Sequence, residues 1–213
     1  MKRFLLSVMP LLAVTNCYAS EPTGWYISEH LGYSLPTKLY AEDADVDNKP
    51  ENMNIELNGA PTIGVVLGYD YGSWRLGTSF NYSYFKLKKA EIHNSHGLAA
   101  KVESGNVHYV DWMFNGYYDI ETASKLTPYI GLGAGPALLY ADGEMKDANP
   151  SDNEDFSDGG GGYVGLAWQG VLGANYRLTD DLSVGAQYRY LGIVDDHARL
   201  KTNTLTFSVT EHF

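Results

Sequence analysis

Cysteine is almost absent from this sequence: Cys17 is the single one in 213 residues. One cysteine can form no disulfide within the chain, and its place near the N-terminus leaves the rest of the chain without thiol chemistry. Basic residues are also scarce, with 15 Lys and Arg against 26 Asp and Glu, for a formal net charge of −11. A chain this acidic is not expected to bind nucleic acid through its phosphates.

Long apolar runs are missing as well. After residue 19, no segment approaches the roughly 20 consecutive apolar residues of a membrane-spanning helix. The apolar run Phe4–Val14 follows a basic head and precedes small residues around Ala19. This pattern predicts a secretory signal peptide over residues 1–19, export by the general secretory pathway, and one domain over residues 20–213.

Stretches in which apolar and small polar residues alternate are abundant, and the clearest is the last stretch of the sequence. One face of a strand there carries Asn203, Leu205, Phe207, Val209, Glu211 and Phe213, and the other carries Thr202, Thr204, Thr206, Ser208, Thr210 and His212. Large apolar residues on one side and small hydroxyls on the other indicate a strand between two unlike solvents. If one solvent is lipid, the strand must belong to a closed barrel, because an open edge in hydrocarbon would leave backbone polar groups unpaired.

Eight segments alternate in this way, and each is near the 9–11 residues that a tilted strand needs to cross the hydrocarbon. They are Gly24–Ser34, Pro61–Tyr71, Trp74–Phe85, His108–Tyr118, Thr127–Tyr140, Gly162–Arg177, Leu182–Leu191 and Thr202–Phe213. Their connections alternate between short and long, and the longer ones are polar. The sequence therefore predicts an all-β fold, an eight-stranded antiparallel up-and-down transmembrane β-barrel with short periplasmic turns and long extracellular loops.

A soluble, lipocalin-like barrel is the alternative, because it also has eight strands in up-and-down order. Alternation alone does not distinguish the two. Aromatic residues at the strand ends, a polar face rich in glycine and threonine, and the terminal phenylalanine favour the membrane barrel.

Three motifs resemble a known family. They are G-W-Y-I-S-E-H-L-G-Y-S at Gly24–Ser34, P-Y-I-G-L-G-A-G at Pro128–Gly135 and G-A-Q-Y-R-Y-L-G at Gly185–Gly192. The chain resembles the small eight-stranded outer-membrane barrels of the opacity-protein and surface-antigen (porin-like) type, similar in shape to the membrane domain of outer membrane protein A. The resemblance implies a Gram-negative outer membrane and assembly by the barrel assembly machinery with periplasmic chaperones.

The same resemblance implies contact with outer-membrane lipids and lipopolysaccharide, and a terminal assembly signal that corresponds here to Leu205, Phe207, Val209 and Phe213. Family members often serve as surface antigens, adhesins or envelope-integrity proteins. We expect such a non-enzymatic role here, with no cofactor and with any host or surface ligand bound by the loops. A small-solute channel is the second hypothesis and a lipid A-modifying enzyme the third.

Polar residues collect on the predicted inner face. They are Arg75, Asn81, Asp111, Asn115, Gln169, Arg177, Gln187 and Arg189. Eight strands leave an interior just wide enough for side chains to fill, so we expect a polar plug in which the three arginines pair with Asp111. An ion pathway through the same residues is the competing hypothesis.

Two acidic residues depart from the pattern, because Glu29 and Glu211 fall on the predicted lipid face. Glu211 is close to the periplasmic end, where a charge costs little. Glu29 is nearer the middle, and either a β-bulge that turns it inward or a contact with a second protomer would account for it.

The long loops contain three further motifs. Acidic runs at Glu42–Asp47 and Asp147–Asp158 lack the glycine and terminal glutamate of a complete calcium loop, so we expect solvated loops and no metal site. His93–His96 could suggest a hydrolase fragment, but a loop tip offers no rigid base–nucleophile pair. Gly159–Gly162 lacks the lysine and the helix of a phosphate loop.

Overall fold

The computed structural model describes residues 23–43, 51–94, 97–147, 161–194 and 198–213. Nearly all of these residues lie in strands: β1 (Gly24–Asp43), β2 (Glu51–Leu57), β3 (Ala60–Asp70), β4 (Trp74–Asn94), β5 (Gly97–Asp119), β6 (Leu126–Asp147), β7 (Gly161–Arg177), β8 (Leu182–Val194) and β9 (Ala198–His212). No helix in the described part of the chain is long and apolar enough to cross a membrane.

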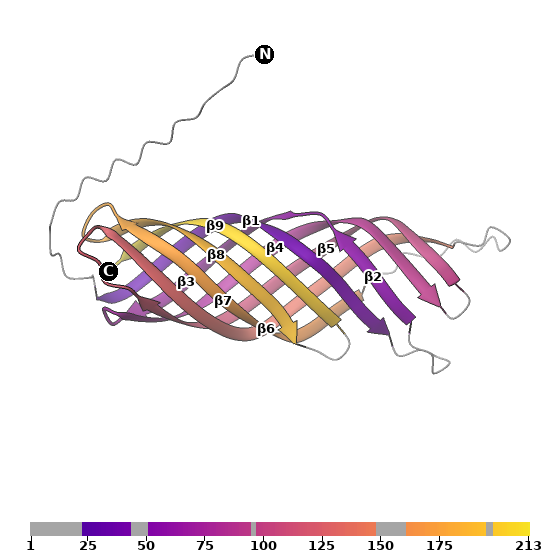
Figure 1. Cartoon of the computed structure of the whole chain (residues 1–213), viewed down its shortest axis with the longest axis horizontal. Coiled ribbons are helices and arrows are strands. Elements are labelled where there is room, and N and C mark those ends of the chain that lie inside the picture. The colour runs from indigo at the N-terminus through magenta and orange to yellow at the C-terminus, as the bar shows by residue number, and fades with distance from the viewer. Residues whose placement is uncertain (1–22, 44–50, 95–96, 148–160, 195–197) are drawn as a thin grey trace, which may run out of the picture.

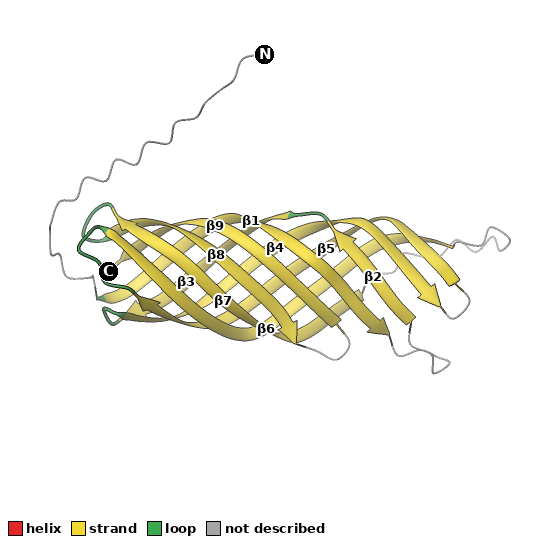
Figure 2. Ribbon diagram, in the orientation of Figure 1, coloured by secondary structure: helices red, strands yellow, loops and turns green. Residues whose placement is uncertain are grey.

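The strands close into one antiparallel barrel (Figures 1 and 2). Each strand from β3 to β9 pairs with the next, and β1 pairs with both β3 and β9, which leaves no open edge around the ring. β2 and β3 both pair with β1 and β4, and β2 lies nearer the end of the barrel that carries the strand extensions. The two segments therefore form one strand of the wall, interrupted at Asn58 and Gly59. The wall of the barrel therefore consists of eight strands, as the sequence predicts.

Short connections gather at one end, called the turn end here, together with the last residue of the chain (Figure 2). The tightest is Tyr71–Ser73, closed by a 2.8 Å bond from Tyr71 N to Trp74 O, and a 2.9 Å bond from Asp119 N to Ser73 O joins it to the end of β5. Gly72 has a φ of +97° there, which glycine adopts without the clash of a Cβ atom. The opposite end, called the loop end, carries the strand extensions (Figure 1).

The strands run further than the sequence predicts. Much of the expected loop between Lys86 and Val107 is β-hairpin, with a register that continues to Asn94 opposite Gly97. β1, β2 and β6 also extend into segments that were expected to be loops, so that part of the prediction was wrong. Where both faces of a strand meet water, no hydrophobic alternation is required, and the sequence signal is lost although the backbone ladder continues.

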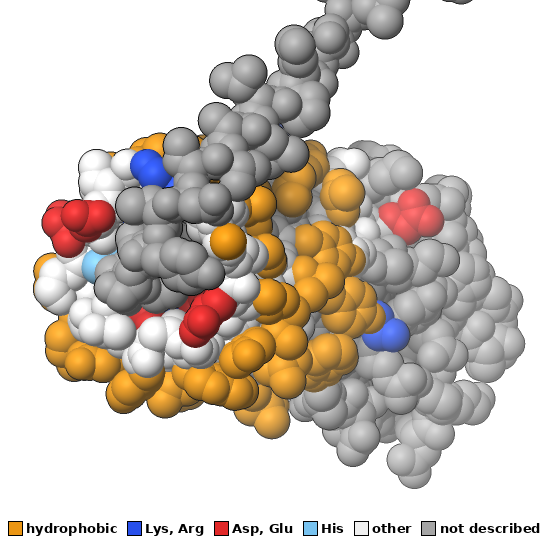
Figure 3. Space-filling model, turned by 60° about the vertical axis from the view of Figure 1, so that its left-hand side comes forward, with side chains coloured by type: hydrophobic (Ala, Val, Ile, Leu, Met, Phe, Trp, Pro, Cys, Tyr) orange, Lys and Arg blue, Asp and Glu red, His pale blue; other side chains and the backbone are white. Residues whose placement is uncertain are grey.

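The outer face of the barrel is an apolar band (Figure 3). Its largest exposed side chains include Leu31, Ile63, Leu76, Phe80, Phe114, Leu132, Val164, Leu172 and Phe207. Aromatic rings border this band at the turn end, where Trp25 contacts Tyr69 at 5.6 Å and Trp74 contacts Tyr118 at 4.9 Å between ring centroids. Tyr33, Tyr84 and Tyr140 stand on the same face nearer the loop end. An apolar belt between two aromatic rims is typical of a barrel in a bilayer.

Candidate functional site

The lumen is the candidate site, and its first layer, at the turn end, is an ion pair. Arg75, the second residue of β4, donates from Nε to Asp119 Oδ2 at 2.6 Å and from Nη2 to Asp119 Oδ1 at 2.7 Å. The two side chains are only 8% and 3% exposed. Paired donors on a planar guanidinium match the two oxygens of a carboxylate, which makes this arrangement one of the stronger polar contacts in proteins.

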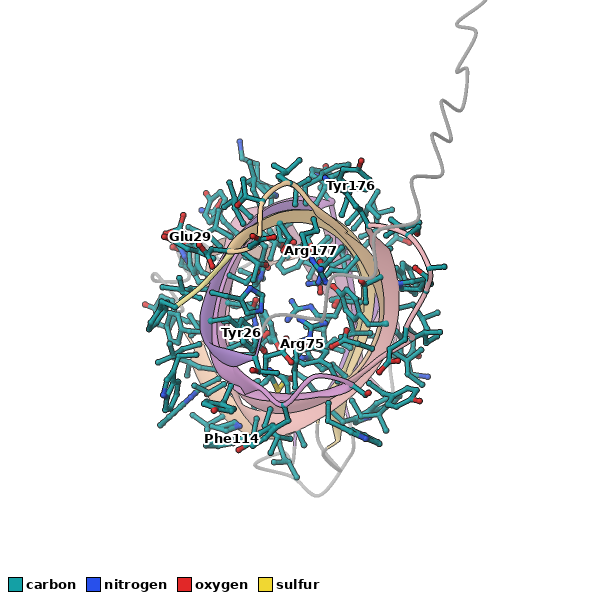
Figure 4. All side chains as sticks on the ribbon, turned by 90° about the vertical axis from the view of Figure 1, so that its left-hand side faces the viewer. Tyr26, Glu29, Arg75, Phe114, Tyr176 and Arg177 are labelled. Carbon is teal, nitrogen blue, oxygen red and sulfur yellow. The ribbon has the colours of Figure 1, made fainter. Side chains whose placement is uncertain are left out.

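Three tyrosines surround the same guanidinium. Its carbon lies 5.6 Å from the ring centre of Tyr26, 5.1 Å from Tyr117 and 4.8 Å from Tyr129. Figure 4 shows Tyr26 and Arg75 projecting into the barrel. The rings fit because glycines face them: a Cβ atom on Gly131 would lie 2.4 Å from the Tyr117 ring. Cation–π contacts add to the ion pair and leave the arginine little room to move.

A second acidic residue, Asp70, lies beside this cage. Its Oδ2 atom is 3.3 Å from His212 Nε2, and its Oδ1 atom accepts a 2.7 Å bond from Gly72 N. Asp70 and His212 line a cavity of about 30 Å³ with Arg177, which reaches it from β7. Arg177 points into the barrel in Figure 4. This cavity has the size of about one water molecule, so the turn-end mouth narrows quickly.

The second layer, near mid-barrel, is centred on Asp111. Asn81 Nδ2 donates to Asp111 Oδ1 at 2.5 Å, and Arg189 Nη1 donates to Asp111 Oδ2 at 3.0 Å. Asn81 Oδ1 lies 2.6 Å from His30 Nε2. Because a carboxylate only accepts hydrogen bonds, the amide nitrogen of Asn81 must face Asp111, and the amide oxygen must then accept a hydrogen bond from His30. The contacts therefore place a proton on His30 Nε2.

A second arm of this layer starts at the same arginine. Arg189 Nη1 also lies 3.3 Å from Gln169 Oε1, Gln169 Nε2 donates to Asn115 Oδ1 at 2.6 Å, and Asn115 Nδ2 donates to Ser79 Oγ at 2.9 Å. Asp111 is 0% and Arg189 is 3% exposed. Side chains that lined an open aqueous channel would be accessible to water, so this layer is closed.

Hydroxyl groups form a border above the polar layers. Ser34 Oγ lies 2.7 Å from Thr62 Oγ1 and 2.6 Å from Thr204 Oγ1, and Thr62 lies 2.7 Å from Ser83. Beyond them the lumen is mostly apolar and buried: Ala60, Phe85, Val107, Tyr109, Ala137, Leu139, Ala167, Leu191, Ile193 and Leu200 pack into one cluster, which Met113 joins from the turn side of Asp111. The expectation of a polar plug was therefore incomplete, because the loop half of the lumen is filled by apolar side chains.

The comparisons with known proteins agree with this architecture. A model of the outer membrane protein beta-barrel domain family matches residues 4–213. The chain belongs to that family. The protein is accordingly an integral protein of the Gram-negative outer membrane, with its turn end in the periplasm and its loop end outside the cell.

The individual relatives share under 30% of their residues with this chain. The outer membrane protein PagN of Salmonella typhimurium is 24% identical over 200 residues, which cover 88% of this chain and 82% of PagN. An uncharacterized protein of Brucella abortus is 29% identical over 196 residues, covering 80% of this chain and 68% of that protein. The crystal structure of Neisserial surface protein A aligns with a TM-score of 0.54 at 17% identity and covers 89% of this chain and 97% of that chain. This last likeness shows the shared fold.

All eight polar residues named from the sequence lie on the inner wall of this outer-membrane barrel. Five of them meet in the layer around Asp111: Asn81, Asp111, Asn115, Gln169 and Arg189. Gln187 lies lower and accepts a 3.0 Å bond from the Tyr129 hydroxyl. Arg177 lines the periplasmic mouth. The expected partner of Arg75 was wrong, because Arg75 pairs with Asp119 and not with Asp111.

Sequence reasoning missed Asp119, Asp70 and His30 as members of the lumen layers. Asp119 was assigned to a turn, although it is an even number of residues from Asp111 and so shares its face. Carrying the alternation one step further would have found it. The tyrosine cage had no comparable signal, because tyrosines occur on both faces of these strands.

The four residues of the proposed assembly signal stand on the lipid face of β9. Leu205 is 53%, Phe207 66%, Val209 51% and Phe213 73% exposed. The backbone nitrogen of Phe213 donates to Trp25 O at 2.9 Å, so the last residue is tied to the first strand.

The two acidic exceptions remain on the outer face. Glu211 lies near the periplasmic end, opposite Ile27 of β1. Glu29 is exposed and points away from the barrel in Figure 4. The pairing of β1 with β3 and with β9 is regular on both sides of Glu29, so the expected bulge is absent and that explanation was wrong. A charge near mid-membrane costs up to about 2–4 kcal/mol for Arg or Lys and less for an acid.

Some candidate residues of the loops fall outside the described structure. They are Asp45, Asp47, Ser95, His96, Asp152, Glu154, Asp155, Asp158, Gly159 and Gly160. Glu42, Asp43, His93 and Asn94 occupy strand positions at the ends of β1 and β4. The hydrolase and calcium hypotheses rest on these segments.

Proposed function

We propose that this barrel is a non-enzymatic surface protein whose interactions are made by the strand wall beyond the membrane. One observation carries the proposal: the lumen is closed, while β4 and β5 run for 21 and 23 residues. Crossing the hydrocarbon takes about 9–11 residues, so about half of each strand stands outside it. A paired hairpin is a more rigid support for a binding surface than a free loop.

The closed lumen argues against both alternatives. A channel needs a continuous water path, but the side chains of the Asp111 layer and of the apolar cluster are buried. An enzyme needs its reacting groups to meet a substrate, but the residues of the Asp111 layer and the Arg75–Asp119 pair bind one another and are buried. What a solvent molecule does not reach, a larger substrate does not reach either.

The test removes the wall beyond the membrane, including most of the part of β4 that pairs with β2, and keeps the membrane-spanning part of the barrel. Replacing residues 88–104 by an Asn-Gly turn shortens the β4–β5 hairpin just above Leu87 and Gly105. We expect the trimmed protein to keep the heat-dependent mobility of a folded barrel, while non-adherent bacteria that express it lose the binding to cultured epithelial monolayers conferred by the full protein. A matched control, Leu132→Ala on the lipid face, should bind like the parent. Binding by the trimmed protein at the parent level, or no binding by the parent, would contradict the proposal.

We further propose that the lipid-face residues of β9 act as the signal for the barrel assembly machinery. The exposure of Phe213 and its bond to Trp25 support this role. A chain that ends at His212 should reach the outer membrane at lower levels than one carrying His212→Ala. Equal surface levels for these two variants would argue against an assembly role for the aromatic side chain of Phe213.

A further inference from the structure

Glu29 occupies an unusual place for a carboxyl group. It lies on the lipid face of β1, four residues from Trp25 and four from Tyr33, the two exposed aromatic residues at either end of the same face. Its cross-strand neighbours are Val65 of β3 and Val209 of β9. The carboxyl group therefore stands midway between the aromatic rims, among apolar side chains.

The chain offers this group no partner of its own. Among the described residues, no side chain hydrogen-bonds to Glu29 or pairs with it. Glu29 lies at an open hollow of about 1090 Å³ on the outer wall, whose lining includes Leu31, Ile63, Phe207 and the two valines that flank Glu29, and extends across β9 and β8 to Tyr176 of β7. Lipid chains can fill a hollow, but they cannot satisfy a polar group in hydrocarbon.

We propose that a second copy of this chain packs against the β9–β1–β3 face, with the two Glu29 carboxyl groups paired across a two-fold axis along the membrane normal. In such an isologous contact each residue on the axis meets itself. A protonated carboxyl has one donor and one acceptor, so two of them close two O–H···O bonds and leave neither net charge nor an unmet polar atom in the lipid.

The surroundings of Glu29 suit this contact. The same two-fold axis sets Val65 of one copy opposite Val209 of the other, and these short side chains let the two walls approach closely. Association in membranes depends on such close packing, because lipid supplies no hydrophobic force between proteins. The hollow gives room for the exposed Phe207 ring, which is 66% accessible in the single chain.

Cysteine cross-linking tests the proposal in isolated outer membranes. In a Cys17→Ser background, Leu31→Cys places a thiol one lipid-facing position above Glu29, and a short bismaleimide should convert most of the protein to a dimer. Leu132→Cys is the matched control, since Leu132 is 73% exposed on β6, across the barrel from β1. It should stay monomeric.

Two changes at Glu29 itself isolate the role of the carboxyl group. With Leu31→Cys present, Glu29→Leu should abolish the dimer, whereas Glu29→Gln should keep it, because an amide also has a donor and an acceptor. Heat-dependent mobility verifies that each variant folds. Equal cross-linking at Leu31 and Leu132, a dimer that survives Glu29→Leu, or a cross-linked product of another mass would overturn the proposal.

Discussion

The two halves of the lumen are closed by different kinds of interaction. The periplasmic half is filled by ion pairs and hydrogen bonds around Arg75 and Asp111, and the extracellular half by apolar side chains such as Phe85 and Leu191. In both halves the central side chains are buried. A polar layer seals the lumen only if its hydrogen bonds are correctly oriented, since every buried donor needs its own acceptor. An apolar layer seals the lumen if its side chains fill the available volume.

This difference predicts different responses to mutation. A polar layer fails when one partner is lost, because the other is left buried and unsatisfied. An apolar layer fails in proportion to the space that is emptied, and it tolerates a change of shape that keeps the volume.

The largest expected effect is the loss of closure itself. Asp111→Ala with Arg189→Ala empties the polar layer, and Phe85→Ala with Leu191→Ala empties the apolar one. Either pair alone should leave planar bilayers without steady currents, because the other half still seals the lumen. All four changes together should give frequent ionic currents. Steady, ion-selective currents from the wild type, or from one pair alone, would show that the two halves do not seal independently.

Next in size is the loss of one member of the caged ion pair. Asp119→Leu leaves the Arg75 guanidinium buried without its carboxylate and should lower the free energy of unfolding by about 3–5 kcal/mol. Urea unfolding in lipid vesicles measures it. The double variant Arg75→Met/Asp119→Leu should lose less than Asp119→Leu alone, since it buries no unpaired charge. A double variant that loses the sum of both single effects would contradict this account.

The sequence was enough to predict the barrel, its strand order and its inner and outer faces, because lipid on one side imposes a strict period of two. The prediction weakened where that contrast weakens. Tyr84 and Phe85, or Tyr190 and Leu191, are consecutive large apolar residues that point to opposite faces, so the alternation seemed to end there. The apolar half of the lumen was missed for this reason.

Pairing within the lumen was harder to predict than orientation. Alternation places Arg75 inward but does not say which carboxylate it meets, because the partner depends on strand register and tilt. Asp119 reaches Arg75 from the last position of β5, at a height that no local pattern specifies. No local pattern predicts the partner of His30 either, because Asn81, which it contacts, is 51 residues away in the sequence.

A single truncation in the apolar half should cost somewhat less than a broken ion pair. Leu191 is 0% exposed, and Leu191→Ala should lower the free energy of unfolding by about 2–5 kcal/mol, because the shorter side chain packs less apolar surface and leaves a cavity behind. Leu191→Met, which conserves volume, should cost under about 1.5 kcal/mol. The same vesicle unfolding experiment compares them. Equal losses for the two variants would mean that closure of this half is not a matter of volume.

The smallest expected effect lies at the hydroxyl border between the halves. Thr62→Val keeps the shape of the side chain but removes its bonds to Ser34 and Ser83, while Ser34 keeps its 2.6 Å contact with Thr204. Each hydrogen bond removed should cost about 0.5–1.5 kcal/mol of unfolding free energy. Ser83→Ala, which removes one of the two bonds from the other side, is the matched control and should cost less. If Thr62→Val instead destabilises the barrel as strongly as Asp119→Leu, the border behaves as part of the polar half, and the directional region extends further toward the cell exterior than the apolar cluster suggests.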